Sequence, residues 1–208
     1  QDIIFFLKET KPKKINILGA GSNTLIRDGG VEGIIVKLSS KFSYLDFTFP
    51  NTIEVGAATL DKKIANFALE HSLTGFEFLS CIPGSIGGAI RMNSGCYGQD
   101  ISKILHSIKV IDMIGNEKNI LASDIKFYYR GSSLDENLII ISVKLQGKPF
   151  LKEEIKKKQE ALIEKKKNAQ PSQIKTCGST FKNTNNKKAW ELIKESNCQN
   201  LKVGNATI

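Results

Sequence analysis

Apolar residues occur along this chain in short runs separated by polar and glycine-rich segments, and these runs predict both strands and helices. Residues 14–18 and 33–38 predict two short buried strands, and the apolar–polar alternation over residues 52–57 predicts a third. Residues 2–10 predict the end of a helix, which stops before Pro12 because proline cannot continue a helix. The N-terminal part of the chain is therefore expected to mix short strands with helix.

A second helix and further strands are expected in the middle of the chain. Thr59 is the expected N-cap of a helix that ends near Gly75. The apolar face of this helix is predicted to consist of Leu60, Ile64, Phe67 and Ala68. Residues 109–123 predict two strands around a Gly-Asn turn, and residues 137–146 predict the strongest strand in the chain. Mixed Lys and Glu over residues 150–168 predict a solvated helix.

Composition and charge argue against two classes of protein. The chain has 208 residues and a formal net charge of +9, yet all but three of its 30 basic residues are lysine. Lysine suits solvated faces, whereas bidentate recognition of phosphates needs arginine, and the chain lacks the alternation of aromatic and basic residues that stacks bases. No apolar run approaches the roughly 18 residues of a membrane span. Neither nucleic-acid binding nor a membrane span is expected.

The cysteines are scattered along the chain and form no C-x-x-C pair. They are Cys81, Cys96, Cys177 and Cys198. Only two histidines accompany them, so no metal site is expected. Reduced thiols in a cytoplasmic protein are the default interpretation.

Two glycine-rich segments carry little side-chain bulk: "LGAGSNTLIRDGG" at residues 18–30 and "IPGSIGGAIRMNSGCYG" at residues 82–98. Glycine permits positive φ and close backbone approach, so successive N–H groups can converge on an anion. The first segment departs from the dinucleotide-binding fingerprint, because Thr24 stands where the third glycine belongs and no helix follows. Each segment contains one arginine, Arg27 in the first and Arg91 in the second. Three roles stay open for each arginine: binding the cofactor, binding the substrate, or supporting the structure.

Two further motifs lie downstream, "FYYRGSS" at residues 127–133 and "TCGSTFKN" at residues 176–183. The arginine among aromatic residues in the first motif either stacks structurally or binds a phosphate or carboxylate. The second motif is either a β-turn or a site, since no Ser-His-Asp arrangement accompanies Ser179. In chain order, these motifs and the two glycine-rich segments resemble the shorter type of UDP-N-acetylenolpyruvoylglucosamine reductase, a family of flavoenzymes of peptidoglycan precursor synthesis.

The resemblance covers nearly the whole chain and implies a fold. It implies an α+β protein with the FAD-binding fold of the vanillyl-alcohol oxidase type, made of two small α/β lobes and followed by part of a substrate-binding lobe. The FAD-binding domain would span residues 1–148, with lobes of about 1–57 and 58–148. Residues 149–170 would form a connecting charged helix, and residues 171–208 would begin a truncated C-terminal substrate-binding domain.

The resemblance also implies the cofactors and the residues that hold them. FAD would bind non-covalently along the two glycine-rich segments, and NADPH would be the hydride donor. The implied cofactor-binding residues are Gly19, Ala20, Gly21, Ser22, Asn23, Thr24, Pro83, Gly84, Ser85, Gly87, Gly88, Ala89 and Gly95.

The implied reaction is that of a UDP-N-acetylmuramate dehydrogenase, which reduces UDP-N-acetylglucosamine enolpyruvate to UDP-N-acetylmuramate. Arg130 would stabilise the negative charge that spreads into the substrate carboxylate, and Ser179 would donate a proton. Tyr129, Lys182 and Asn183 match substrate-binding positions. The implied partner is therefore a UDP-sugar enolpyruvyl ether, handled in the cytoplasm.

The family pattern also contains parts that this sequence lacks. The opening segment before the first helix is missing, as is a third catalytic residue, a glutamate beyond Ile208, so the sequence is interpreted as truncated at both ends. A chain ending at Ile208 is expected to bind flavin without appreciable turnover. The alternatives are a flavin- or nucleotide-binding fragment without turnover, and another oxidoreductase of the same flavin fold.

Overall fold

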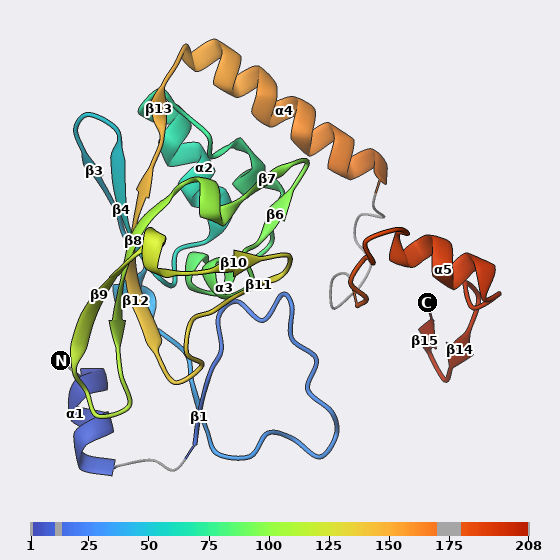
Figure 1. Ribbon diagram of the computed structural model, residues 1–208, viewed down its shortest axis with the longest axis horizontal. Helices are drawn as coiled ribbons and strands as arrows, with labels where there is room; N and C mark the ends of the chain where they lie inside the picture. Colours follow the sequence, from blue (N-terminus) through green and yellow to red (C-terminus); the bar gives the residue numbers. More distant parts are fainter. Residues whose placement is uncertain (1, 11–13, 170–179, 208) are drawn as a thin grey trace. The chain divides into compact units, whose positions relative to one another are not determined.

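The structure of the protein, a computed structural model, describes residues 2–10, 14–169 and 180–207 (Figure 1). The described residues fall into two compact units, one before and one after the gap at residues 170–179. Each unit is described by itself.

A five-stranded antiparallel sheet forms the centre of the first unit (Figure 1). Its strands, in spatial order, are β3 (Leu45–Thr48), β4 (Thr52–Gly56), β12 (Ile139–Gln146), β8 (Leu105–Ile111) and β9 (Glu117–Leu121). The central strand, β12, is the segment predicted to be the strongest strand. The turn between β8 and β9 also lies where the Gly-Asn pair predicted it, with Gly115 at a φ of +85°.

The main core lies between one face of this sheet and three helical elements. These are α2 (Asp61–Glu70), the 3₁₀ helix η2 (Glu77–Cys81) and α3 (Ile86–Arg91), and α4 (Lys152–Ala169) packs on the outside of α2 and η2. From β12, the side chains of Ile140, Val143 and Leu145 enter this core. Figure 1 shows α2 and α3 on the same side of the sheet.

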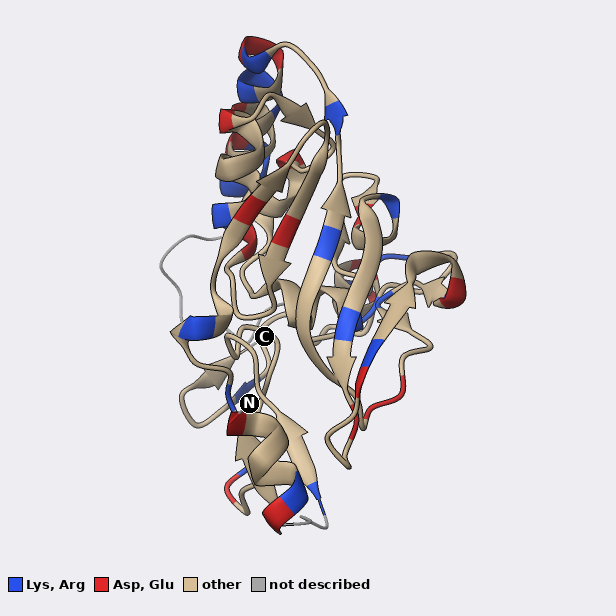
Figure 2. Cartoon of the chain, turned by 90° about the vertical axis from the view of Figure 1, so that its left-hand side faces the viewer, with Lys and Arg blue, Asp and Glu red and all other residues tan. Residues whose placement is uncertain are grey.

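Helix α1 (Asp2–Thr10) covers part of the opposite face. Its Leu7 forms a second apolar cluster with Ile139 and Ile141 of β12, and this explains why β12 is buried on both faces. Elsewhere the strands of the sheet carry charged residues, which are coloured blue and red in Figure 2. They form cross-strand ion pairs, with Lys109 Nζ 2.5 Å from Glu117 Oε2. Such exposed pairs contribute little, typically ~0–1 kcal/mol.

The two N-terminal strands form where they were predicted but are not buried. β1 (Ile15–Ile17) and β2 (Ile34–Val36) pair in parallel as a separate two-stranded sheet. Ile34 is 41% exposed and Ile35 is 45% exposed. The prediction of buried strands is therefore wrong, because an apolar run shows strand propensity but not what covers the strand.

The start of α2 also corrects a prediction. Thr59 is not the N-cap, because its hydroxyl donates to the Tyr44 carbonyl oxygen over 3.1 Å and the helix begins at Asp61. Leu60 occupies the cap position and is 45% exposed, so it does not belong to the buried face. The helix ends at Glu70, earlier than the predicted end near Gly75.

The remaining elements are short. In the first unit they are η1 (Ser40–Phe42), β5 (Leu73–Thr74), β6 (Gly95–Cys96), β7 (Gln99–Asp100), η3 (Ile101–Lys103), η4 (Ala122–Asp124), β10 (Phe127–Tyr128), β11 (Gly131–Ser132) and β13 (Lys148–Pro149). The second unit contains α5 (Ala189–Glu195), β14 (Lys202–Val203) and β15 (Ala206–Thr207). Among the described residues, no helix has the length and apolarity that a membrane crossing demands.

Candidate flavin-binding site

The two glycine-rich segments, far apart in sequence, meet in the first unit. We call residues 18–33, between β1 and β2, the first loop, and residues 82–98, which include α3, the second loop. The Ser22 hydroxyl donates to the Pro83 carbonyl oxygen over 2.5 Å. A Cβ added to Gly19 would lie 2.8 Å from Ser85 Oγ, so only glycine fits there without a shift. These contacts define a loop junction with little side-chain bulk.

Glycines at this junction leave room beside the backbone. Gly21 has a φ of +78°, which glycine adopts readily, and no atom lies within 4 Å of where its Cβ would be. Gly84 is more enclosed, because an added Cβ would lie 3.4 Å from Ser22 Oγ. The first loop therefore has an open backbone, whereas the second loop is packed where the two meet.

Gly87 and Gly88 are adjacent in sequence but differ in their surroundings. The Gly87 N–H donates to the Ala57 carbonyl oxygen over 3.0 Å, and an added Cβ would lie 3.1 Å from that same oxygen. Nothing lies within 4 Å of an added Cβ on Gly88, which is exposed. Gly87 thus allows close packing of α3 on the chain after β4, while Gly88 faces open space. Helix α3 itself was not predicted, because three of its six residues are small and leave too few apolar side chains to show a helical period.

The other predicted cofactor-binding residues differ in their exposure to solvent. Ala20, Asn23 and Thr24 are exposed on the first loop, whereas Ser85 and Ala89 are buried in the second loop. Gly95 belongs to the β6–β7 hairpin, where an added Cβ would lie 2.3 Å from the Gln99 carbonyl oxygen. Gly95 is therefore required by the hairpin itself.

Arg130 lies on the hairpin turn between β10 and β11 and contacts the second loop. Its backbone has a φ of +61°, a left-handed conformation that costs a non-glycine residue roughly 1–3 kcal/mol. Its Nη1 donates to the Gly95 carbonyl oxygen over 3.0 Å, and its guanidinium lies 5.3 Å from the centre of the Tyr129 ring. Tyr129 is 54% exposed. The structure thus brings two predicted site residues, Arg130 and Gly95, into contact.

Asn93 connects the same hairpin to the second loop and was not predicted. It is buried, with a φ of +39°. Its Nδ2 donates to the Tyr128 carbonyl oxygen over 3.3 Å, and its Oδ1 accepts from the Ser102 N–H over 3.1 Å. No sequence signal distinguishes this asparagine from an ordinary turn residue, because its partners are distant in the chain.

The two arginines of the loops have different roles. The Arg91 guanidinium donates to four backbone carbonyl oxygens, those of Leu134, Asp135, Glu136 and Leu138. Burial lowers the pKa of Arg91, and nearby Asp135 and Glu136 oppose that shift. Arg91 therefore has a structural role, because it holds the loop at residues 134–138. The sequence alone had left the role of this arginine open. The Arg27 side chain is exposed and makes no hydrogen bond or ion pair with any other described residue.

Asp61 is a second residue that the sequence did not single out. It is fully buried at the start of α2, and its Oδ2 would lie 3.1 Å from a Cβ added to Gly84. Neither carboxylate oxygen has a hydrogen-bond partner among the described residues. The only signal was an acidic residue in the first turn of a helix, which usually indicates a solvated side chain.

Two thiols also lie near the second loop. Burial raises the pKa of Cys96 to about 11, with nearby Cys81 raising it further and Lys166 lowering it. The Cys96 thiol donates to the Phe78 carbonyl oxygen over 3.6 Å. A thiol in this state is neutral at physiological pH and a poor nucleophile.

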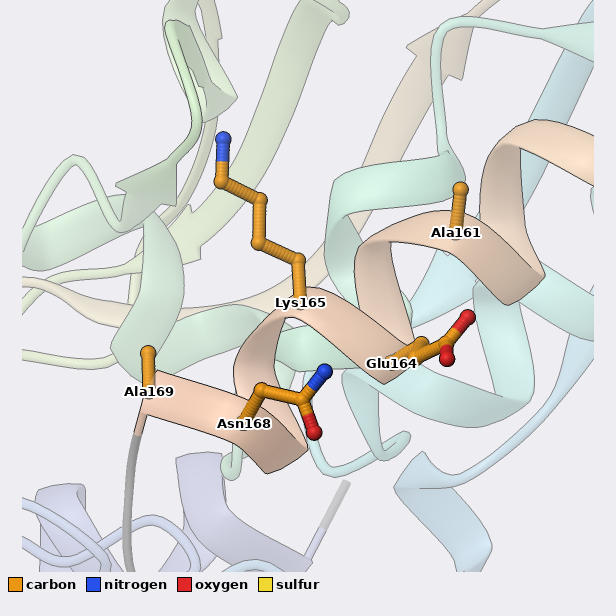
Figure 3. Close-up of a pocket in the computed structure, with 5 residues that line it drawn as sticks. All are labelled: Ala161, Glu164, Lys165, Asn168 and Ala169. Carbon is orange, nitrogen blue, oxygen red and sulfur yellow. The ribbon is translucent and has the colours of Figure 1, made fainter.

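A pocket on α4 lies apart from these residues. It has a volume of about 460 Å³ and is lined by Ala161, Glu164, Lys165, Asn168 and Ala169, all of one helix (Figure 3). The Lys165 side chain extends away from the helix in Figure 3, and its Nζ lies 4.9 Å from the centre of the Tyr97 ring. None of the predicted site residues lines this pocket.

The second unit contains two of the predicted substrate-binding residues. Asn183 Oδ1 accepts from the Ala189 N–H over 2.9 Å at the start of α5, and Lys182 is exposed. Ser179, the predicted proton donor, lies outside the described residues. No group of three or more metal-binding side chains is found in the parts of the chain that the structure describes.

Comparison with known proteins gives two family matches and several close relatives. The family described as "FAD binding domain" matches residues 1–120, and the family described as "UDP-N-acetylenolpyruvoylglucosamine reductase, C-terminal domain" matches residues 170–208. The UDP-N-acetylenolpyruvoylglucosamine reductase of Pelagibacter ubique (strain HTCC1062) is 46% identical over 211 residues, which covers 100% of this chain and 70% of that protein. The protein of that name from Wolbachia pipientis wMel is 38% identical, with the same coverage.

Solved structures agree with these matches. The UDP-N-acetylenolpyruvylglucosamine reductase of Thermus caldophilus has a TM-score of 0.87 and 31% identity, covering 98% of this chain and 73% of that chain. A carbon monoxide dehydrogenase from Hydrogenophaga pseudoflava has a TM-score of 0.54 at 13% identity, covering 71% of this chain and 56% of that chain, and therefore shares only the fold. The predicted α+β fold, a FAD-binding domain of the vanillyl-alcohol oxidase type followed by part of a C-terminal domain, is confirmed.

Proposed function

This chain belongs to the UDP-N-acetylenolpyruvoylglucosamine reductase family, and on that premise we propose that it takes part in the NADPH-dependent, FAD-mediated reduction of UDP-N-acetylglucosamine enolpyruvate to UDP-N-acetylmuramate. This reaction is a step in peptidoglycan precursor synthesis. The observation that carries the proposal is the loop junction, where Ser22 contacts Pro83 and Gly19 packs on Ser85. The cytoplasmic location and NADPH as the donor are predictions that follow from this reaction.

The residues at the junction fit FAD. A Cβ added to Gly21 or to Gly88 would have no other atom within 4 Å. The backbone at these two glycines is therefore open enough for a pyrophosphate to approach it closely. Ser22, Asn23 and Thr24 add short polar groups along the first loop. When bound, FAD supplies the hydride-transfer chemistry that the side chains cannot perform themselves. We propose that the exposed residues of both loops hold its pyrophosphate.

Arg130 is the residue we propose to stabilise charge in the substrate. Among the described residues, its hydrogen bond to the Gly95 carbonyl oxygen uses one donor of a guanidinium that has five. The other donors remain for a carboxylate, for which planar, bidentate geometry is well suited. The contact with Gly95 also fixes the guanidinium beside the second loop before any substrate arrives, and such preorganised contacts typically contribute about 3 kcal/mol to the transition state.

Ser179 is the proposed proton donor, and the two half-reactions test it. Proton donation belongs only to reduction of the substrate, so Ser179→Ala in the protein containing this chain is expected to leave flavin reduction by NADPH unchanged. Reduction of the enolpyruvyl substrate is expected to slow by roughly 100-fold or more. Anaerobic rapid mixing, followed by flavin absorbance, measures each step separately. Equal slowing of both steps means that Ser179 is structural, and a protein without bound flavin contradicts the proposed function itself.

A further inference from the structure

Asp61 combines burial with missing partners at the loop junction. Its side chain is 0% exposed, and both carboxylate oxygens lack a hydrogen-bond partner among the described residues. Buried polar groups are nearly always paired, so an unpaired carboxyl calls for an explanation. A purely structural position would be filled by an apolar residue at lower cost.

The carboxyl faces the loop junction. The Asp61 N–H donates to the Gly84 carbonyl oxygen over 3.1 Å, which fixes the residue against the second loop. A Cβ added to Gly84 would lie 3.1 Å from Asp61 Oδ2 and 3.4 Å from Ser22 Oγ. The carboxyl therefore lies directly behind the two loops that are proposed to hold the pyrophosphate.

Among the described residues, no cationic side chain forms an ion pair with Asp61. Burial raises the pKa of Asp61 to about 8, and no other cause contributes. On its own helix, Lys62 and Lys63 are exposed. The facing loops carry no charged residue at positions 19–24 or 82–89. A pKa of about 8 keeps the carboxyl mostly protonated at pH 7, and desolvation is the cause.

We infer that Asp61 is a positioning residue for FAD that works only in its neutral form. Neutral Asp61 lets the junction accept the anionic pyrophosphate, whereas an ionised carboxylate behind the same backbone would repel it in a medium of low dielectric. Binding of FAD and loss of the Asp61 proton therefore oppose each other. This inference rests on the proposed FAD site, and it adds that the site releases flavin at alkaline pH.

The direction of the pH dependence follows from this opposition. Bound pyrophosphate raises the pKa of Asp61 above its value in the flavin-free protein, so FAD affinity is constant below about pH 8 and falls above it. In the pH range where Asp61 is ionised in the flavin-free protein but still protonated in the FAD complex, the affinity for FAD falls by nearly tenfold per pH unit. Asp61→Asn keeps the size and neutrality of the protonated side chain, so its FAD affinity is expected to stay constant across the same range.

Equilibrium titration with FAD tests this inference, with the dissociation constant measured from flavin fluorescence at pH 6.5 to 9.5 and constant ionic strength. Three proteins are compared: the unchanged chain, Asp61→Asn, and Asp46→Asn as a control that removes an exposed carboxylate of β3. The unchanged chain and the control are expected to lose at least tenfold in affinity above pH 8, and Asp61→Asn to lose less than twofold.

Each outcome decides one claim. A dissociation constant of the unchanged chain that does not vary with pH overturns the role of Asp61, as does a pH dependence that persists in Asp61→Asn. If Asp61→Asn does not fold, the profiles of the other two proteins still decide, because absence of the alkaline fall overturns the inference. No FAD binding by the unchanged chain at any pH contradicts the proposed function rather than the role of Asp61.

Discussion

The first and second loops are both rich in glycine and both contain one arginine, yet the first unit holds them very differently. The first loop is bounded by two short, half-exposed strands, and its Leu25 is 74% exposed. The second loop contains a helix, and its backbone is hydrogen-bonded to the chain after β4 at Ile86 and Gly87. One loop is therefore an open strip of backbone and the other is a packed element of the core.

This difference shows that glycine serves two purposes in one site. At Gly21 it supplies a positive φ in open space, whereas at Gly87 it allows close packing on Ala57, whose carbonyl oxygen would lie 3.1 Å from an added Cβ. We expect the packed loop to act as a rigid platform and the open loop to close on the pyrophosphate. Substitutions matched between the two loops test this contrast.

The largest expected effect is at Arg91. Arg91→Lys removes the guanidinium that donates to four backbone carbonyl oxygens, and a single ammonium group cannot replace these hydrogen bonds. The free energy of unfolding is therefore expected to fall by about 4 kcal/mol. Arg27→Lys in the first loop is expected to change it by less than about 0.5 kcal/mol. Urea denaturation of the flavin-free protein measures both. Equal losses would show that the two loops are held alike.

An intermediate effect is expected at the adjacent glycines of α3. Gly87→Val is expected to lower the free energy of unfolding by about 2–3 kcal/mol, because the new side chain meets the Ala57 backbone. Gly88→Val is expected to cost under about 1 kcal/mol but to weaken FAD binding at least tenfold. Denaturation and flavin titration of both variants separate the two roles. A Gly88→Val protein with unchanged flavin affinity would remove this position from the site.

The smallest effect is expected at the contact between the loops. Ser22→Ala removes the hydrogen bond to the Pro83 carbonyl oxygen, so unfolding is expected to become easier by about 1 kcal/mol. If that contact preorganises the junction, the FAD dissociation constant rises about fivefold, since each 1.4 kcal/mol is tenfold. Ser123→Ala, an exposed serine of η4, is the control. A stability loss without a change in FAD affinity would place the flavin elsewhere on the first loop.

Several elements were predictable from the sequence because their signals are local. The run at residues 137–146 forms the central strand, and the Lys and Glu pattern at residues 150–168 forms α4. The prediction for Thr59 was wrong because a tertiary hydrogen bond to Tyr44 competes for the hydroxyl that would cap the helix. Burial of the N-terminal strands was also wrong, since propensity does not encode which surfaces are covered.

The sequence by itself determined the family and the two segments of bare backbone, because motif order and glycine content can be read along the chain. Only the tertiary structure decided that the segments meet at Ser22 and Pro83, that Arg91 binds carbonyl oxygens while Arg130 faces the second loop, and that Asp61 is buried behind the junction. The reason is physical: the charge state and the role of a polar side chain depend on its neighbours and on its exposure to water. Those neighbours come from distant parts of the chain and are set only when the core forms.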